Sequence, residues 1–166
     1  MKTLIVIRHA KAVAHDAAPT DFERALAPRG HEEAARVATH LSAHCPAPDM
    51  MIVSTAKRTE ETAVHFAAAW NIDQRAIVHE PRVYDAPLRM LMTVIAELPE
   101  NVSTVAIVGH NPSVSDLVYY LTSGEYAGMS TSTVVIVDMQ HAVTWDEVAS
   151  GTGRVRAVYE PAKSGR

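Results

Sequence analysis

Three short runs of aliphatic residues constrain the fold of this chain most, and they cover residues 4–7, 50–53 and 105–108. The first run, LIVI, is typical of a strand that is buried on both faces of a sheet. Segments with apolar residues at helical spacing lie between the runs, and this alternation indicates βαβ units around a mostly parallel sheet. Because parallel crossovers are right-handed, helices should cover both faces. We therefore predict an α/β fold, a three-layer α/β/α sandwich.

The same patterns place the individual elements along the chain. Strands are expected at about 3–8, 50–53, 77–78, 105–108, 133–137 and 154–158. Two helices are expected at about 30–44 and 56–70, a third in a segment that Pro87 opens and Pro99 ends, and a fourth in one that Pro112 opens and that ends near Gly124.

Length and composition indicate one soluble globular domain. Of the 166 residues, 48% are hydrophobic and 20% charged, and the net charge of −4 gives no sign of a nucleic-acid-binding surface. We predict a single domain over residues 1–160 and a frayed tail over 161–166. No apolar stretch is long enough to span a membrane, and the first residues lack a signal-peptide pattern. Because Cys45 is the only cysteine, no intrachain disulfide can form, and we expect a cytoplasmic protein.

Basic residues follow the end of each aliphatic run. Arg8 and His9 follow the first run, Lys57 and Arg58 come soon after the second at the start of a helix, and His110 follows the third. In open α/β sheets ligands bind beyond the carboxyl ends of the strands, which parallel strands bring to one rim. Guanidinium groups match phosphate oxygens bidentately, and helix N-termini add free backbone N–H groups. The sequence therefore predicts a site for a phosphate dianion.

The motifs that are absent restrict the chemistry of this site. Neither glycine-rich signature for nucleotide phosphates is present, and there is no cluster of carboxylates suited to Mg²⁺. An imidazole is then the available nucleophile, because histidine can carry a covalent phosphoryl group. His9 would attack phosphorus in line while arginines stabilise the charge on the equatorial oxygens. A hydrogen bond from its other ring nitrogen to a backbone carbonyl would fix the tautomer, and a leaving alkoxide would need a nearby acid.

Short motifs follow one another in a characteristic order. They are LIVIRHA at 4–10, DFERAL at 21–26 followed by Gly30, STAKRT at 54–59 with ETA at 61–63, VYDA at 83–86, and VGHNP at 108–112. This series resembles the histidine phosphatase superfamily, which includes the phosphoglycerate mutases, and within it the short SixA-like branch of phosphohistidine phosphatases. The resemblance implies a phosphoglycerate mutase-like fold. Two positions differ from the superfamily's usual pattern, since Ala10 replaces a glycine, as is familiar in the SixA-like branch, and Thr55 replaces a proline.

The resemblance implies catalytic roles for the residues at the strand ends. His9 would be the nucleophile that becomes phosphorylated. Arg8, Arg58 and His110 would bind the phosphoryl group. The resemblance implies neither a metal nor an organic cofactor.

Two further residues of the motifs have alternative interpretations. Arg24 matches an arginine near the family's pocket and is a candidate substrate-binding residue, but an arginine in a surface ion pair would fit the sequence equally well. Asp85 is the candidate acid that protonates the leaving group. Its alternative is a carboxylate that caps a helix or closes a turn.

Together these residues predict a phosphatase that works through a phosphohistidine at His9. A chain this short has little room for capping insertions, so the pocket should be open. An open pocket suits a phosphorylated side chain on a protein surface better than a small metabolite, which an enclosed pocket would bind. The phosphorylated side chain that we expect is phosphohistidine. The alternatives are a general phosphomonoesterase for small molecules and a non-catalytic phosphate-binding module, although such a module would not need the nucleophile. Neither nucleic acid nor a membrane is expected as a partner.

Overall fold

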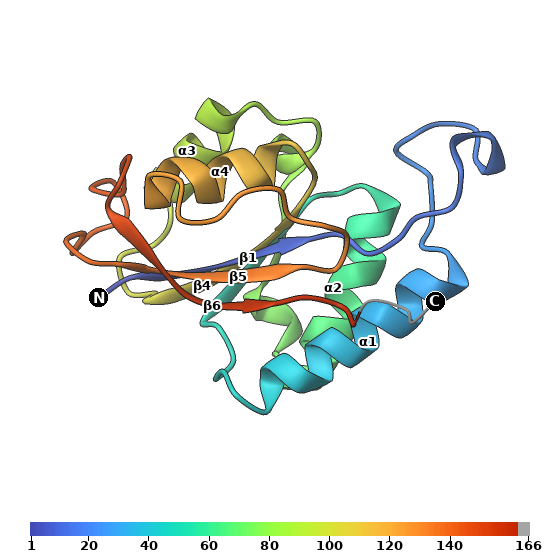
Figure 1. The fold of residues 1–166 in the computed structure, drawn as a ribbon, viewed down its shortest axis with the longest axis horizontal. Helices are drawn as coiled ribbons and strands as arrows, with labels where there is room; N and C mark the ends of the chain where they lie inside the picture. The colour runs from blue at the N-terminus through green and yellow to red at the C-terminus, as the bar shows by residue number, and fades with distance from the viewer. Residues whose placement is uncertain (163–166) are drawn as a thin grey trace.

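A mixed six-stranded sheet forms the middle layer of the protein in the computed structural model, which describes residues 1–162 (Figure 1). The strands are β1 (Thr3–Arg8), β2 (Met50–Val53), β3 (Ile77–His79), β4 (Thr104–Gly109), β5 (Val134–Met139) and β6 (Gly153–Tyr159), in the spatial order β3-β2-β4-β1-β5-β6. The pairs β3–β2, β2–β4 and β4–β1 are parallel, whereas β5 and β6 add an antiparallel edge. The prediction of a mostly parallel sheet is confirmed.

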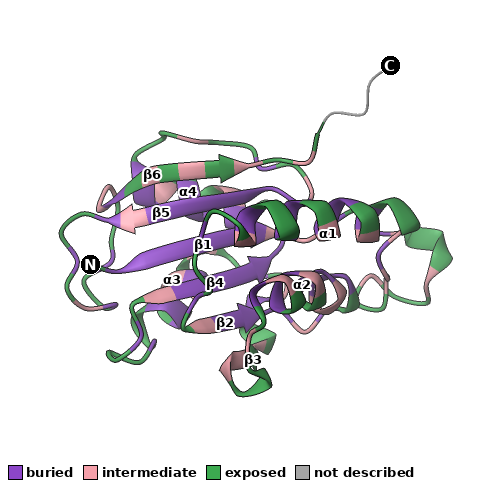
Figure 2. Cartoon of the chain, turned by 90° about the horizontal axis from the view of Figure 1, so that it is seen from below, coloured by how far each residue is buried: buried purple, intermediate pink, exposed green. Residues whose placement is uncertain are grey.

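Helices cover both faces of the sheet, as the right-handed crossovers require. The helices are α1 (Pro28–Ser42), α2 (Lys57–Trp70), α3 (Leu88–Ala96) and α4 (Ser113–Thr122), with short 3₁₀ helices at His15–Ala17, Gln74–Ala76 and Pro81–Val83. Helices α1 and α2 lie on one face and α3 and α4 on the other (Figures 1 and 2). Within residues 1–162, every helix is too short or too polar to cross a bilayer.

The predicted boundaries need small corrections. Helix α1 covers residues 28–42 instead of 30–44, because Pro28 occupies its first turn, where its missing N–H costs nothing. Pro87 and Pro112 do not lie inside their helices but just before them, at the N-cap positions. Residues 161 and 162 have no regular secondary structure, and the rest of the predicted tail, 163–166, lies outside the described residues.

Strand β1 is buried on both faces and separates two apolar clusters (Figure 2). Leu4 and Val6 pack in the cluster with α3 and α4, while Ile5 and Ile7 pack in the cluster with α1 and α2. All four side chains are completely inaccessible to solvent. Because consecutive side chains of a strand point to opposite faces, the unbroken aliphatic run supplies both clusters at once.

The segment after β1 is held against the start of α1 by a close backbone contact. The N–H of Ala27 donates to the carbonyl oxygen of Lys11 over 2.8 Å, and a Cβ on Gly30 would collide with that same carbonyl. Glycine at position 30 of the sequence motif is therefore required by this close approach of two backbones. The contact fixes the chain just beyond His9.

The carboxyl ends of three parallel strands lie side by side. Arg8 pairs with Gly109 across β1 and β4, and the N–H of Ser54, just after β2, donates to the carbonyl of Val108 over 3.1 Å. The N–H of His9 donates to the carbonyl of Gly109 over 3.0 Å. The three aliphatic runs therefore bring their polar followers to one rim of the sheet, as predicted from the sequence.

Candidate active site

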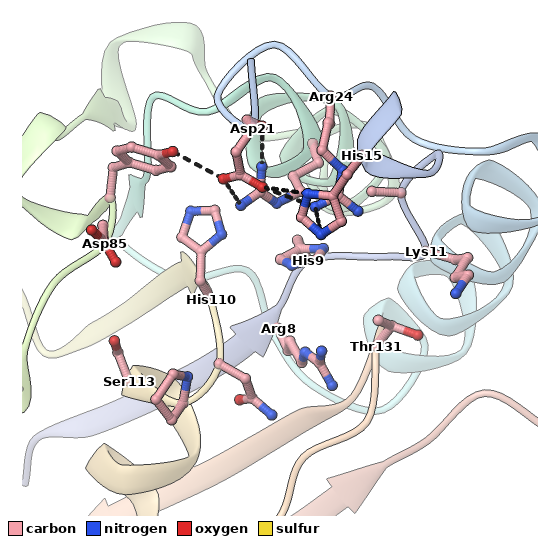
Figure 3. Close-up of a pocket in the computed structure, with 15 residues that line it drawn as sticks. Arg8, His9, Lys11, His15, Asp21, Arg24, Asp85, His110, Ser113 and Thr131 are labelled. Atoms are coloured by element: carbon pink, nitrogen blue, oxygen red, sulfur yellow. Dashed lines mark hydrogen bonds and ion pairs between the residues drawn. The ribbon is translucent and has the colours of Figure 1, made fainter. Parts of the chain in front are cut away.

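A pocket of ≈ 620 Å³ lies at this rim of the sheet (Figure 3). All the site residues predicted from the sequence line it, namely Arg8, His9, Arg24, Arg58, Asp85 and His110. The remaining lining residues are Lys11, Ala12, His15, Asp21, Tyr84, Asn111, Pro112, Ser113 and Thr131. Within residues 1–162, no three histidine, cysteine or acidic side chains are grouped so as to hold a metal ion.

The backbone around His9 fixes both its position and its tautomer. Its Nδ1 atom lies 2.7 Å from the carbonyl oxygen of Ala10. Because a carbonyl can only accept, Nδ1 carries the hydrogen and Nε2 keeps its lone pair. Burial is the main cause that lowers the pKa of His9, the Ala10 hydrogen bond raises it, and nearby guanidinium groups lower it, with a net pKa of about 4. The ring is therefore neutral at pH 7 and its Nε2 atom can act as a nucleophile.

His110 lies next to His9, with 5.2 Å between the two ring centroids. Its Nε2 atom is 2.8 Å from the hydroxyl oxygen of Ser54. Burial, together with His9 and Arg58, lowers the pKa of His110 to about 3, so this ring is also neutral. Its Nδ1 atom is buried and has no hydrogen-bond partner in the described part of the chain.

Arg8 and Arg58 are each held by bonds at the end of the guanidinium. Nη1 of Arg8 donates to the carbonyl of Met129 over 2.9 Å. Nη1 of Arg58 donates to the carbonyl of Asp21 over 2.7 Å, and its Nη2 donates to Oδ2 of the same residue over 3.0 Å. The Nε atoms of both arginines are buried and, within residues 1–162, have no partner.

A buried polar nitrogen without a hydrogen-bond partner lowers the stability of the fold, and several such nitrogens lie in this one pocket. The Nε atoms of Arg8 and Arg58 and the Nδ1 atom of His110 belong to side chains that line the same cavity as the nucleophile His9. A bound group with several acceptor oxygens and negative charge would satisfy them. The arrangement is thus suited to binding an anion in front of a neutral imidazole.

Arg24 both lines the pocket and forms an ion pair. Its guanidinium lines the pocket, and its Nη1 donates to Oδ1 of Asp21 over 2.9 Å in an ion pair. Its Nε donates to the carbonyl of Val13 over 3.0 Å, which leaves the side chain only slightly exposed. The ion pair exists, but it lies inside the pocket and not on the outer surface.

Asp85 lies at the exposed side of the pocket. Its backbone has a φ of 49°, in the left-handed region that few residues other than glycine adopt. The N-cap of α3 is Pro87, and the helix has no side-chain cap, so the helix-capping interpretation of Asp85 is wrong. Asp85 does lie in a turn, as the other alternative proposed. The carboxylate remains available to a group bound in the pocket.

Sequence reasoning missed three polar residues that hold the site together. Ser54 contacts His110, and the Tyr84 hydroxyl donates to Oδ2 of Asp21 over 2.9 Å. Asp21 also accepts from Arg24 and Arg58. All three lie within motifs that were recognised. Their spacing, however, gives no sign of these contacts, because the contacts join a loop, a strand end and a 3₁₀ segment that only the tertiary fold brings together.

The fold and site define a protein of the histidine phosphatase type, and comparison with known families agrees. The family model of the histidine phosphatase superfamily (branch 1) matches residues 4–88. The chain belongs to this superfamily. A protein of Mycobacterium tuberculosis (strain H37Rv) with no assigned activity is 38% identical over 117 residues, which is 70% of either chain.

Solved structures of SixA proteins share the whole fold. The candidate phosphohistidine phosphatase SixA of Agrobacterium tumefaciens has a TM-score of 0.81 and 27% identity, with 96% of this chain and 98% of that chain covered. The corresponding candidate from Nakamurella multipartitia also has a TM-score of 0.81, with 25% identity and coverage of 98% and 97%. The expected phosphoglycerate mutase-like α/β fold is therefore confirmed.

The lowered pKa values predict that acid destabilises the protein through the site. His9 and His110 bind protons near pH 6.5 when unfolded but only at about pH 4 and 3 when folded. Their contribution to stability is complete above pH 6.5 and is lost as the pH falls toward 4. Between pH 6.5 and 5, the free energy of unfolding should fall by about 1–2 kcal/mol for each histidine. Urea denaturation at a series of pH values measures this loss.

The contribution of His110 to this pH dependence can be measured separately with a single substitution. His110→Gln should reduce the pH dependence of the unfolding free energy, because the unfolded variant has one fewer group to protonate. His141→Gln, which removes an exposed imidazole far from the pocket, controls for the substitution itself. An undiminished pH slope in His110→Gln would contradict the burial of a neutral His110.

Proposed function

We propose that the protein is a phosphatase that transfers a phosphoryl group to Nε2 of His9 and then to water. The proposal is carried by one observation: around the neutral His9 ring, Arg8, Arg58 and His110 each have a buried nitrogen that is unpaired within residues 1–162. In the first step the bond from phosphorus to the leaving group breaks as the bond to Nε2 forms. In the second step water attacks phosphorus, the bond to Nε2 breaks, and inorganic phosphate leaves.

The arginines and His110 stabilise the phosphoryl group during both steps. The guanidinium groups of Arg8 and Arg58 remain charged and face the equatorial oxygens, where negative charge is spread in the transition state. The hydroxyl of Ser54 lies 2.8 Å from Nε2 of His110 and, in the proposed mechanism, donates its hydrogen to that nitrogen. Nδ1 of His110 then carries a hydrogen for a phosphoryl oxygen.

We propose phosphohistidine on a protein as the preferred substrate. The exposed side chains of Lys11, His15 and Asp85 line the mouth of the pocket. A side chain that projects from another protein can enter such a mouth. The similarity to candidate phosphohistidine phosphatases of the SixA type supports the same choice.

Phosphate release with and without His9 tests this function. The wild-type chain should release phosphate from a phosphohistidine-bearing protein in the presence of a chelator, and His9→Ala should lower kcat by about 10³-fold or more because the covalent route is lost. His141→Ala, an exposed histidine outside the pocket, should retain activity. A colorimetric phosphate assay, run beside p-nitrophenyl phosphate, provides the measurement.

The other outcomes of this assay lead to the alternatives. Turnover of p-nitrophenyl phosphate alone would make the protein a general phosphomonoesterase for small molecules. Turnover of neither substrate, with phosphate still bound, would make it a phosphate-binding module.

We propose Asp85 as the acid for leaving groups that need a proton. Asp85→Asn should lower kcat/KM for a phosphoserine peptide by about 10–100-fold, because a serine alkoxide leaves poorly without a proton. The loss with phosphohistidine should stay below about threefold, since imidazole is the better leaving group. Steady-state kinetics with both substrates gives the ratio, and p-nitrophenyl phosphate, whose leaving group needs no proton, is the internal control. An equal loss with all three substrates would show that Asp85 is not the acid.

A further inference from the structure

The carboxylate of Asp21 is the centre of the polar network above the pocket, and dashed lines converge on it in Figure 3. Its oxygens accept from Nη1 of Arg24 over 2.9 Å, from Nη2 of Arg58 over 3.0 Å and from the Tyr84 hydroxyl over 2.9 Å. Nδ1 of His15 lies 3.7 Å from Oδ1. An anion of the chain itself thus already occupies part of the cationic pocket.

Asp21 determines how Arg58 faces the site. The backbone carbonyl and the side-chain carboxylate of this one residue accept from Nη1 and Nη2 of Arg58. Two bonds to one residue fix the plane of the guanidinium, and the Nε edge is left buried and, within residues 1–162, unpaired. The arginine is therefore held with a free edge directed away from Asp21.

The carboxylate also opposes the binding of a second anion. Burial raises the pKa of Asp21, but the hydrogen bonds from Arg24, Tyr84 and Arg58 lower it more, and the net result is a pKa well below the usual range. Asp21 is therefore ionised at pH 7. A phosphate dianion bound by Arg58 would share that guanidinium with a fixed negative charge, and like charges a few ångströms apart repel.

We propose that Asp21 is a positioning residue with two effects on the reaction: it orients Arg58 for the transition state, and it weakens the binding of inorganic phosphate so that the product leaves. This inference rests on the proposed phosphatase function of the pocket. The two effects separate in Asp21→Asn, because asparagine has one side-chain acceptor oxygen for three donors and no charge. Orientation is then loosened while repulsion is removed.

Kinetics and calorimetry on Asp21→Asn test the proposal. With p-nitrophenyl phosphate, kcat should fall about tenfold, because Arg58 loses its fixed orientation. Inorganic phosphate should bind roughly five- to tenfold more tightly, both as a product inhibitor and in direct titration calorimetry, because one repelling charge is gone. Asp16→Asn makes the same charge change at an exposed position of the same loop, outside the pocket, and should alter neither quantity. Tyr84→Phe removes one bond to Asp21 but no charge, and should not tighten phosphate binding.

A purely structural role for Asp21 would give a different result. Damage to the pocket would lower kcat and weaken phosphate binding together, and this outcome would overturn the proposal. Equal tightening in Asp16→Asn and Asp21→Asn would also overturn it, since net charge alone would then be the cause. A wild-type chain that binds phosphate but turns over no substrate would refute the proposed function and the orienting effect, while the calorimetric comparison would still decide whether Asp21 weakens phosphate binding.

Discussion

The complete burial of strand β1 is the constraint on which the rest of the structure depends. Its aliphatic side chains fill the apolar clusters on both faces of the sheet, so the strand cannot shift or tilt without exposing one of them. Arg8 and His9 follow directly, and the backbone of His9 is bonded to Gly109 on one side and to Ser132 on the other. A nucleophile that needs an accurate position is therefore attached to one of the most rigid elements of the fold.

The electrostatics of the site follow from the same burial. Loss of hydration keeps the rings of His9 and His110 neutral, while the guanidinium groups of Arg8 and Arg58 stay charged beside them. A neutral nucleophile among cations suits attack on a negatively charged phosphoryl group, because the cations attract the substrate without removing the lone pair of Nε2. Asp21 supplies a compensating negative charge that is paired with Arg24 and Arg58.

Most of the fold and the floor of the site could be predicted from the sequence, because both depend on local patterns. Aliphatic runs define the parallel strands, and strand ends necessarily meet at one rim, so the proximity of His9, Arg58 and His110 followed directly. The contacts of Asp21 could not be predicted from the sequence. They depend on the path of the loop that carries Asp21 over the pocket, and a loop has no periodic pattern of apolar residues from which its path could be predicted. The capping interpretation of Asp85 failed for a similar reason, since the backbone turns at a positive φ before α3 begins.

Detection of the phosphorylated enzyme tests the central claim most directly. Wild-type protein mixed with a ³²P-labelled phosphoprotein substrate and quenched in alkali within milliseconds should carry a label that is stable to base, labile to acid, and located in the peptide that contains His9. Label on that peptide would establish His9 as the nucleophile that this structure predicts. Turnover without any labelled enzyme, or with the label on another residue such as His110, would contradict the account.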